Sequence, residues 1–433
     1  MKYKAYSQKN FDKIPQVQQY LSQQEINEIK VVAQVLPFKA NNYLTEELID
    51  WPNHREDPIF NLVFPCREML LEEHFSQVQS AMGGHAGELK ELIRRIQYSL
   101  SPHPAGQMDK NVPSLEGSRL SGIQHKYDAT TLFFPGNGQT CHAYCAFCFR
   151  WAQFVGINEL KFGMKEVDLL INYLRANPQI TDVLFTGGDP MIMSAKVLRS
   201  YIEPLINADL PGLSTIRIGT KALGFWPYKF TTDHDADETL KLFEEVVEKG
   251  YHLAFMGHFS HPVEMKTPVV EEAIRRIRKT GAEIRTQSPV MKHVNDSAEV
   301  WKEMWAEQVK QGCIPYYMFV ARDTGAQDYF AVTLADSYRI FNEAYKSLSG
   351  LARTVRGPSM SSDLGKVQVC GVTEVQGEKL FVLNYIQARD DEMVGKPFFA
   401  RYDEEATWIN HLEPALGSEA FFPQAFTAAT LLT

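Results

Sequence analysis

The chain has 433 residues and a net charge of −9, and 44% of its residues are hydrophobic and 22% are charged. This composition is typical of a soluble globular protein, and the length predicts one large domain with appendages or two to three domains. The negative charge argues against nucleic acid as a bulk electrostatic partner. No apolar run approaches the roughly 20 residues that a membrane span needs. The polar N-terminus and the six sparse cysteines predict a cytoplasmic protein without a signal peptide.

The first region, residues 1 to about 120, is expected to be mainly helical. Within it, Asp57–Pro65 is an apolar segment bracketed by prolines, and we expect it to dock on the main domain. A run rich in Pro, Gly and Ser, from Ser101 to Gly122, predicts a linker or surface loop.

A second region, 121–346, alternates short β-branched runs with amphipathic helices. Strands are expected at 131–135, 182–186, 214–220, 252–256, 283–286 and 316–320. The helix that starts at Thr267-Pro268 is expected to bury Val270, Ala273, Ile274 and Ile277. Repeated βα units predict a parallel sheet, either doubly wound or a partial barrel, with ligands at the carboxyl ends of its strands. The third region, 347–433, contains a predicted hairpin (366–369 with 379–383) that closes this rim.

Three of the six cysteines, Cys141, Cys145 and Cys148, fall within eight positions after the first of these strands. A [4Fe-4S] cluster held by three cysteines keeps one iron free for an exchangeable ligand. We therefore expect an enzyme that cleaves S-adenosylmethionine reductively at that iron. Zinc is the alternative, with His142 as a possible fourth ligand, but structural zinc usually takes paired cysteine units and no second pair is present.

Other polar residues fall at the same predicted rim. Gly187-Gly188-Asp189 offers unobstructed backbone N–H groups and a carboxylate to the amino group of an amino-acid-like ligand, or forms an ordinary tight turn. Thr220 ends the third strand and Gln287 lies at the end of the fifth. His258 and His261 are candidates for metal ligation, for ligand binding or for a structural role.

Two basic residues are singled out as substrate and cofactor groups. Arg150, two residues beyond the last cysteine, suits bidentate capture of a carboxylate. Ser359–Lys366 is interpreted as a loop of hydroxyl-bearing residues that ends in Gly-Lys. There Lys366 could bind pyridoxal phosphate covalently while the hydroxyls receive the phosphate, although ordinary surface loops can look the same.

Together these motifs resemble the radical S-adenosylmethionine superfamily and, within it, the lysine 2,3-aminomutase family. The resemblance runs from about Asp57 to Ile386. It is carried by Asp57-Pro58, His125-Lys126-Tyr127, the cysteine triplet with Arg150, Gly187-Gly188-Asp189-Pro190, Ile216–Thr220, His258–Pro262, Gln287-Ser288, Asn295-Asp296, Pro315-Tyr316-Tyr317 and Gly365-Lys366.

This resemblance implies a partial (β/α)6 barrel between the helical N-terminal region and the C-terminal region. An electron, from a donor such as flavodoxin or ferredoxin, would pass through the cluster and release a 5′-deoxyadenosyl radical that abstracts hydrogen from substrate. The resemblance implies that Lys366 carries pyridoxal phosphate and that Arg150 binds the substrate α-carboxylate. The cofactor-binding residues are expected to be Tyr127, Gly187, Gly188, Asp189, Thr220, His258, Gln287 and Lys366, with Cys141, Cys145 and Cys148 on the cluster.

The chain departs from lysine-specific members at the substrate end. Where those members carry two aspartates for the distal ammonium, this chain has Arg322 and Arg356, although Asp323 would restore one acid after a shift of one residue. Two guanidiniums favour a carboxylate or phosphate and repel an ammonium, so a substrate other than lysine is expected. The arginine that assists the cofactor phosphate in the family is absent, and Lys126 or either new arginine could replace it.

The predicted activity is a pyridoxal-phosphate-dependent 2,3-aminomutase that acts on an amino acid other than lysine, a small-molecule substrate. One alternative is a radical enzyme without pyridoxal phosphate that rearranges, dehydrogenates or epimerises a small substrate bearing a carboxylate or phosphate. Another is a non-catalytic iron–sulfur or zinc-binding regulator. A homo-oligomer is expected by analogy with the family, with Ile59–Phe64 as a possible contact surface.

Overall fold

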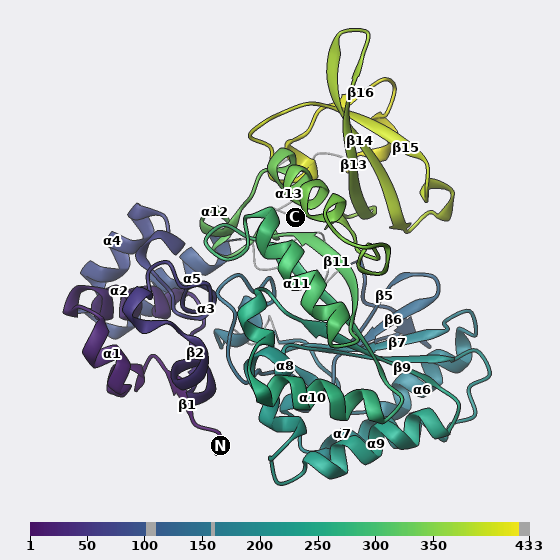
Figure 1. The fold of residues 1–433 in the computed structure, drawn as a ribbon, viewed down its shortest axis with the longest axis horizontal. Helices are drawn as coiled ribbons and strands as arrows, with labels where there is room; N and C mark the ends of the chain where they lie inside the picture. Colours follow the sequence, from purple (N-terminus) through teal and green to yellow (C-terminus); the bar gives the residue numbers. More distant parts are fainter. Residues whose placement is uncertain (101–109, 157–160, 424–433) are drawn as a thin grey trace.

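The structure, a computed structural model, describes residues 1–100, 110–156 and 161–423. Its centre is a twelve-stranded sheet in which β5 to β16 lie side by side in chain order (Figure 1). Six consecutive strands are parallel: β6 (Thr130–Phe133), β7 (Asp182–Phe185), β8 (Thr215–Thr220), β9 (His252–His258), β10 (Glu283–Val290) and β11 (Ile314–Val320). The predicted strands in the second region are therefore confirmed.

A helix follows each of these strands. They are α6 (Val167–Ala176), α7 (Ala195–Ile206), α9 (Ala236–Glu248), α10 (Pro268–Lys279), α11 (Ala298–Lys310) and α13 (Leu334–Lys346). In Figure 1, α6, α7, α9 and α10 lie below the sheet. Because the strand order never reverses, the sheet is singly wound, and the doubly wound alternative is wrong. All six carboxyl ends meet at one edge, as predicted.

The helix α10 illustrates why local sequence patterns worked in this region. It begins at Pro268 after Thr267 and buries Val270, Ala273, Ile274 and Ile277, as its period of 3.6 predicts. The Thr267 hydroxyl does not cap the helix, because it hydrogen-bonds the Tyr43 hydroxyl at 2.9 Å instead. This contact joins the helix to the N-terminal region.

The C-terminal strands extend the same sheet. The strand β12 (Arg356–Ser361) is parallel to β11, and β13 (Gly365–Val375) and β14 (Glu378–Ala388) form the predicted hairpin. β15 (Pro397–Arg401) and β16 (Pro414–Ala415) complete this edge, which projects at the top of Figure 1. The predicted loop 359–366 is instead the end of β12, a turn and the start of β13. At the opposite edge, β5 (Ile123–Tyr127) forms an antiparallel hairpin with β6 where no strand was predicted.

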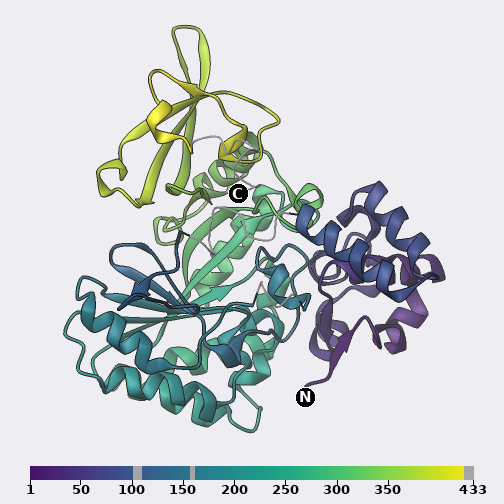
Figure 2. The same ribbon diagram turned by 180° about the vertical axis from the view of Figure 1, so that it is seen from behind.

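The N-terminal region lies beside the sheet and is largely helical, as predicted (Figure 2). It includes α2 (Gln23–Val35), α4 (Glu72–Ala81) and α5 (Ala86–Ser99), and Ser22 with Glu25 forms a capping box that starts α2. Two short strands, β1 (Ala5–Ser7) and β2 (Lys39–Asn41), pair with each other. Buried side chains of this region and of the parallel sheet belong to one apolar core, whereas those of the C-terminal strands form a second core.

The segment 57–65 docks as predicted. It forms the short helix α3 (Pro58–Val63), and Ile59, Leu62 and Phe64 are fully buried. The N–H of Ala146, in the cysteine loop, donates to the Leu62 carbonyl at 2.8 Å. Because the chain buries this segment itself, the expectation that Ile59–Phe64 mediates association is wrong. The Pro-, Gly- and Ser-rich run lies partly outside the described residues, which resume at Lys110.

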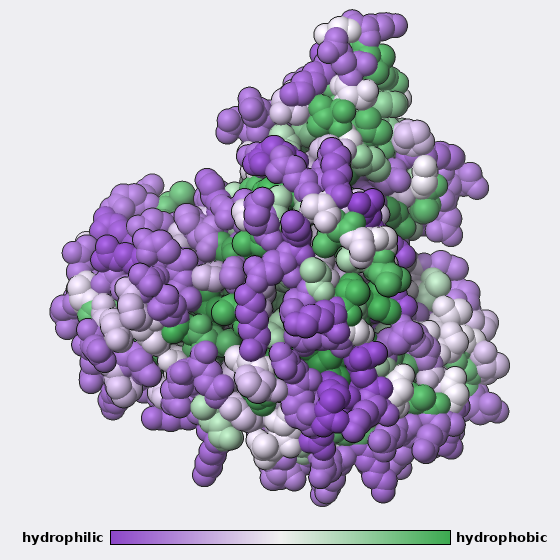
Figure 3. Space-filling view, in the orientation of Figure 1, coloured by the Kyte–Doolittle hydropathy of each residue, from purple (hydrophilic) through white to green (hydrophobic). Residues whose placement is uncertain are grey.

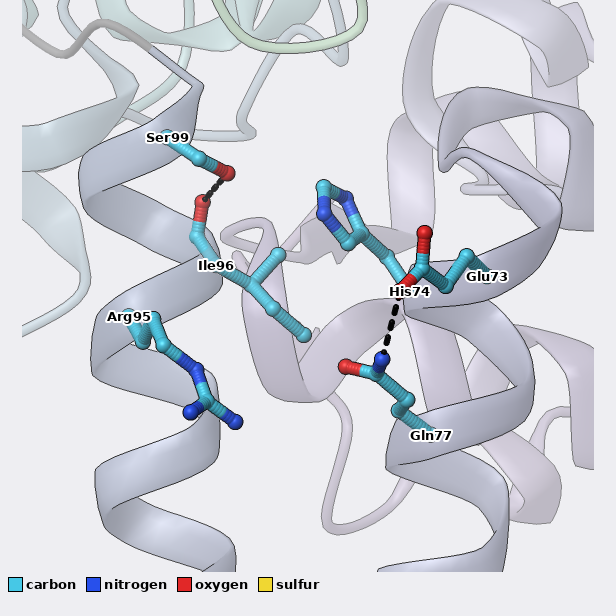
Figure 4. A pocket seen from close by; sticks show the side chains of 6 residues that line it. All are labelled: Glu73, His74, Gln77, Arg95, Ile96 and Ser99. Carbon is cyan, nitrogen blue, oxygen red and sulfur yellow. Dashed lines mark hydrogen bonds between the residues drawn. The ribbon is translucent and has the colours of Figure 1, made fainter.

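The outer surface is mostly hydrophilic on the face shown in Figure 3. Figure 4 shows a polar hollow between α4 and α5, lined by Glu73, His74, Gln77, Arg95, Ile96 and Ser99, and none of the predicted site residues lies in it. Within the described ranges, no helix has both the length and the apolar character needed to cross a membrane.

Candidate active site

The cysteine loop follows β6 and places its three thiols near one another. Cys141, Cys145 and Cys148 are partly buried and unpaired, and the thiols of Cys145 and Cys148 act electrostatically on that of Cys141. Burial raises the pKa of each thiol. In the part of the chain that is described, no three Cys, His, Asp or Glu side chains converge on a single-ion site. A cubane distributes its cysteines over separate iron atoms, so three neighbouring thiols fit a cluster better than one zinc ion.

The cysteine loop is held from outside by the N-terminal region. The Lys39 ammonium donates to the Cys141 carbonyl at 2.6 Å, and the Tyr144 N–H donates to the Lys39 carbonyl at 2.8 Å. The Tyr3 hydroxyl and the Asn41 amide both donate to the His142 carbonyl, at 2.6 and 3.3 Å. These residues were missed by the sequence analysis, and β2 carries no motif that could have revealed them.

Gly187 and Gly188 fit closely against the residues that precede the cysteines. Gly187 has φ +139°, and a Cβ there would collide with the Gln139 side chain. A Cβ on Gly188 would lie 2.5 Å from the Thr140 backbone. The Asp189 N–H donates to the Thr140 carbonyl at 2.8 Å. Because neither glycine has a side chain, the backbone after β7 can pack directly against the residues that precede the cysteines.

The Asp189 carboxylate is engaged inside the protein. It accepts hydrogen bonds from the Thr220 hydroxyl at 2.6 Å and from the backbone N–H groups of Met191 and Lys221, both at 2.9 Å. Burial raises the pKa of Asp189 to about 6, although these hydrogen bonds oppose the shift. Asp189 and Thr220 thus join the carboxyl ends of β7 and β8, next to the cysteine loop.

The imidazole of His258 lies against the same loop. Its ring centroid is 5.6 Å from that of Phe147, and its Nε2 is 3.2 Å from the Ser260 hydroxyl. Burial holds the pKa of His258 well below its usual value, so this imidazole is neutral at neutral pH. His261 serves as the N-terminal cap of the turn Pro262–Met265, which favours the structural alternative for that residue.

A buried ion pair supports this end of the sheet. The Lys221 ammonium donates to Glu264 at 2.6 Å and to the Ser260 hydroxyl at 3.1 Å. The side chain of Glu264 is fully buried and that of Lys221 is 9% exposed. Glu264 also accepts from the backbone N–H groups of Ser260 and His261. The pair therefore fixes the backbone that carries His258.

Arg150 connects the cysteine end of the site to a second group of cations. Its guanidinium lies 4.2 Å from the Phe134 ring centroid and 5.2 Å from that of Phe149, and it acts electrostatically on Cys148 and on Arg322. It forms neither a hydrogen bond nor an ion pair with any described residue. Burial lowers the pKa of Arg150 to about 9. The guanidinium is therefore a partly buried cation without an anionic partner among the described residues, which suits capture of a carboxylate.

The ammonium of Lys366 lies at the other end of this group. It is 4.2 Å from the ring centroid of Tyr317, on β11, and no hydrogen bond or ion pair links it to another described residue. Burial and the guanidiniums of Arg217, Arg356 and Arg322 lower the pKa of Lys366 to about 7. Such an amine is largely neutral, and hence nucleophilic, at slightly alkaline pH.

Arg322 and Arg356 occupy different positions around Lys366. Arg322 is partly buried between the rings of Phe149 (5.0 Å) and Trp408 (5.9 Å), and it donates to the Ser361 carbonyl at 3.4 Å. Arg356 is exposed, and its guanidinium donates to the Tyr317 hydroxyl at 3.3 Å. Arg322 therefore lies deeper in the site than Arg356 does.

Two of the three serine hydroxyls before Lys366 are engaged within the protein. The Ser362 hydroxyl donates to the Gly365 carbonyl and accepts from the Gly365 N–H, both at 3.2 Å, which closes the β12–β13 turn. The Ser359 hydroxyl is buried against the Met318 carbonyl. The turn thus uses the Ser362 hydroxyl and Ser359 packs against β11, while the phosphate site in this segment stays a prediction.

Three predicted residues lie along the same edge. Lys126, on β5, donates to the Ser362 carbonyl, and burial together with neighbouring cations lowers its pKa to about 7. The phenol of Tyr127 is buried near Arg322, and burial raises its pKa. Gln287 lies between His258 and Tyr317 in the strand register. The predicted residues thus form a continuous series from the cysteines to Lys366, with Arg356 at its exposed margin.

Comparison with known proteins identifies the relatives of this chain. No family model matches it. A protein of Aquifex aeolicus named "Putative L-lysine 2,3-aminomutase" is 29% identical over 391 residues, which cover 90% of this chain and 91% of that protein. The L-lysine 2,3-aminomutase of Bacillus subtilis is 29% identical over 232 residues, or 53% of this chain and 44% of that protein. That second match therefore spans less than half of the relative.

Solved structures give a weaker likeness. A radical S-adenosylmethionine methyltransferase from Kitasatospora setae has 12% identity and a TM-score of 0.31 over 44% of this chain and 36% of that one. Likeness at this level supports no conclusion. The relatives by sequence confirm the predicted resemblance: the chain is a homologue of proteins named lysine 2,3-aminomutase, which are enzymes of the isomerase class.

Proposed function

We propose that this protein is a radical S-adenosylmethionine enzyme that moves an amino group between carbons 2 and 3 of an amino acid other than lysine. Cys141, Cys145 and Cys148 would hold a [4Fe-4S] cluster, and Lys366 would hold pyridoxal phosphate. The cluster supplies the electron that cleaves S-adenosylmethionine, and pyridoxal phosphate supplies delocalisation for a substrate radical. In this proposal the singly wound sheet is a partial (β/α)6 barrel whose N-terminal and C-terminal regions flank its open edge.

The observation that carries the proposal is the state of Lys366. A lysine that is partly buried, lacks an ion-pair partner among the described residues and has a pKa of about 7 costs stability in the free protein. Such a cost is typical of a functional amine. The neighbouring ammonium of Lys126 suits a phosphate, in line with the expectation that Lys126 replaces the arginine that is missing from this chain.

The charges around Lys366 support the expectation of an anionic or hydrogen-bonding substrate group. The charged groups that act on its ammonium are cations, namely three guanidiniums and the Lys126 ammonium. The Asp323 carboxyl interacts instead with Arg322 and His411. Arg150 would receive the α-carboxylate and Arg322 the distal group. A second ammonium would find no matching carboxylate near Lys366.

The test uses anaerobically purified protein reconstituted with iron, sulfide and pyridoxal phosphate. Borohydride reduction followed by peptide mass spectrometry should place a pyridoxyl group on Lys366, and the Lys366→Ala variant should lack it. Exposed Lys379, on the same hairpin, provides the control variant Lys379→Ala, which should keep the label. A label elsewhere, or full activity of Lys366→Ala, would contradict the aminomutase proposal.

Substrate charge is tested separately. The double variant Arg322→Asp, Arg356→Asp replaces two cations by two anions. When L-lysine and L-glutamate compete as substrates, this variant should form a larger share of its product from L-lysine than the wild type does. If the wild-type protein already converts L-lysine faster than L-glutamate, the substrate proposal is wrong.

The electron would come from a flavodoxin- or ferredoxin-type donor, and reconstitution with each protein tests this partner. Size-exclusion chromatography with light scattering tests the expected homo-oligomer.

The second candidate keeps the radical step without pyridoxal phosphate. The engagement of the Ser359 and Ser362 hydroxyls with protein carbonyls favours it, because fewer hydroxyls then remain for a cofactor phosphate. In that case protein reconstituted with the cluster alone would form both 5′-deoxyadenosine and product. Product that requires added pyridoxal phosphate would exclude this candidate.

A further inference from the structure

The ammonium of Lys39 is the positive charge that the N-terminal region brings to the cysteine loop. It donates to the Cys141 carbonyl at 2.6 Å and lies 5.7 Å from the ring centroid of Tyr144 and 6.0 Å from that of Tyr3. It acts electrostatically on the Cys141 thiol. No carboxylate of the described residues forms an ion pair with it. Its charge is therefore directed at the loop and is not neutralised by any carboxylate in the part of the chain that the structure describes.

The position of this ammonium is fixed from several sides. Lys39 belongs to β2, which pairs with β1, so its backbone is not free to move away. The Lys39 carbonyl accepts the Tyr144 N–H from the loop at 2.8 Å, and the Tyr3 hydroxyl donates to the adjacent His142 carbonyl at 2.6 Å. The contact spans 102 positions of sequence, so it is a tertiary arrangement and not a local turn. The lysine is thus held against Cys141 at both its backbone and its side chain.

A fixed cation next to a cysteine ligand has a defined effect on a redox group. Reduction of a cluster adds one electron, and hence one negative charge, at the thiolates and their irons. A nearby positive charge stabilises the reduced form more than the oxidised form and raises the reduction potential. Because burial lowers the effective dielectric constant, the effect is larger than it would be for a surface lysine.

We propose that Lys39 is a positioning residue that sets the reduction potential of the metal group held by Cys141, Cys145 and Cys148. This inference rests on the proposed function, since it requires that the cysteines hold a redox-active cluster. It assigns to the N-terminal region a part in electron uptake, beyond its packing against the sheet. Lys39 makes no proposed contact with substrate and takes no part in the transfer of the amino group.

The test is a potentiometric titration of the reconstituted full-length protein, followed by electron paramagnetic resonance of the reduced cluster. Lys39→Gln keeps a hydrogen-bond donor but removes the charge, Lys39→Met removes both, and Lys39→Arg keeps the charge. The matched control is Lys4→Met, because Lys4 is an exposed lysine of the same region whose ammonium lies 5.1 Å from the Tyr6 ring centroid. Iron and sulfide content are measured for every variant.

In Lys39→Gln and Lys39→Met, the equilibrium constant for reduction of the cluster is expected to fall by a factor of ten or more. For a one-electron couple, a factor of ten lowers the reduction potential by about 59 mV. Lys39→Arg should recover most of the shift, and Lys4→Met should match the wild type. An unchanged potential in iron-replete Lys39→Gln would overturn the inference. If the wild-type protein assembles no cluster, the proposed function itself fails, so the two failures are distinguishable.

Discussion

Replacement of Lys366 by methionine is expected to stabilise the folded, cofactor-free protein near neutral pH. Burial and three guanidiniums lower the pKa of Lys366 from 10.5 to about 7, whereas the unfolded chain keeps the ordinary value. Between these values the unfolded state binds more protons, so this group makes stability rise with pH. Folding at pH 7.5 must expel the proton at a cost of about 4 kcal/mol, and at pH 9.5 the cost is about 1.4 kcal/mol.

Because Lys366 is only partly buried, solvent screening is expected to reduce the gain at pH 7.5 to about 2 to 4 kcal/mol. The assay is urea unfolding of wild-type and Lys366→Met protein at both pH values, followed by tryptophan fluorescence. The gain should shrink markedly at pH 9.5, whereas exposed Lys379→Met should give no difference that depends on pH. A Lys366→Met variant that is less stable at pH 7.5, or equally affected at both pH values, would refute the reasoning.

Three other substitutions test the supports of the cysteine end. Thr220→Val removes the hydroxyl that donates to Asp189 and should lower the free energy of unfolding by about 1–3 kcal/mol. The same variant should bind S-adenosylmethionine more weakly in equilibrium dialysis. The control Thr220→Ser keeps the hydroxyl and should resemble the wild type in both measurements. Lys221→Met leaves the buried Glu264 without its counter-ion and should cost about 3–5 kcal/mol in urea unfolding, part of which Glu264→Gln in the same chain should restore. Cys145→Ser should lose iron on reconstitution, and retention of the full iron content would contradict its assignment as a ligand.

The sequence predicted the parallel strands and the shared edge because both follow from local patterns. The buried positions of α10 repeat with the helical period, and an alternating series of strands and helices leaves few topologies for the chain. The cysteines and Asp189 follow strand ends and His258 is the last residue of a strand, so the sequence predicted that they share one edge. The proximity of these residues therefore follows from the order of strands in the chain, and it could be predicted without knowledge of side-chain contacts.

Tertiary contacts explain what the sequence did not predict. Lys39 and Asn41 reach the cysteine loop across more than 100 positions, and no local period records such a contact. The strand β5 contains His125-Lys126-Tyr127, whose polar side chains obscure the alternation expected of a strand. Gly187 was expected either to leave room for a ligand or to form a tight turn, whereas the Gln139 side chain is the group that a Cβ there would meet.

The continuous sheet also restricts how the site can admit its substrate. Lys366 lies on β13, which is hydrogen-bonded through β12 to β11 in the parallel part of the sheet. A rigid swing of the C-terminal region would break that ladder, so opening must be confined to turns such as Ser362–Leu364 and to side chains such as exposed Arg356. The strand register thus fixes the position of Lys366 relative to β11. Under the proposed function, a substrate would therefore reach Lys366 without a rigid movement of β13 relative to β11.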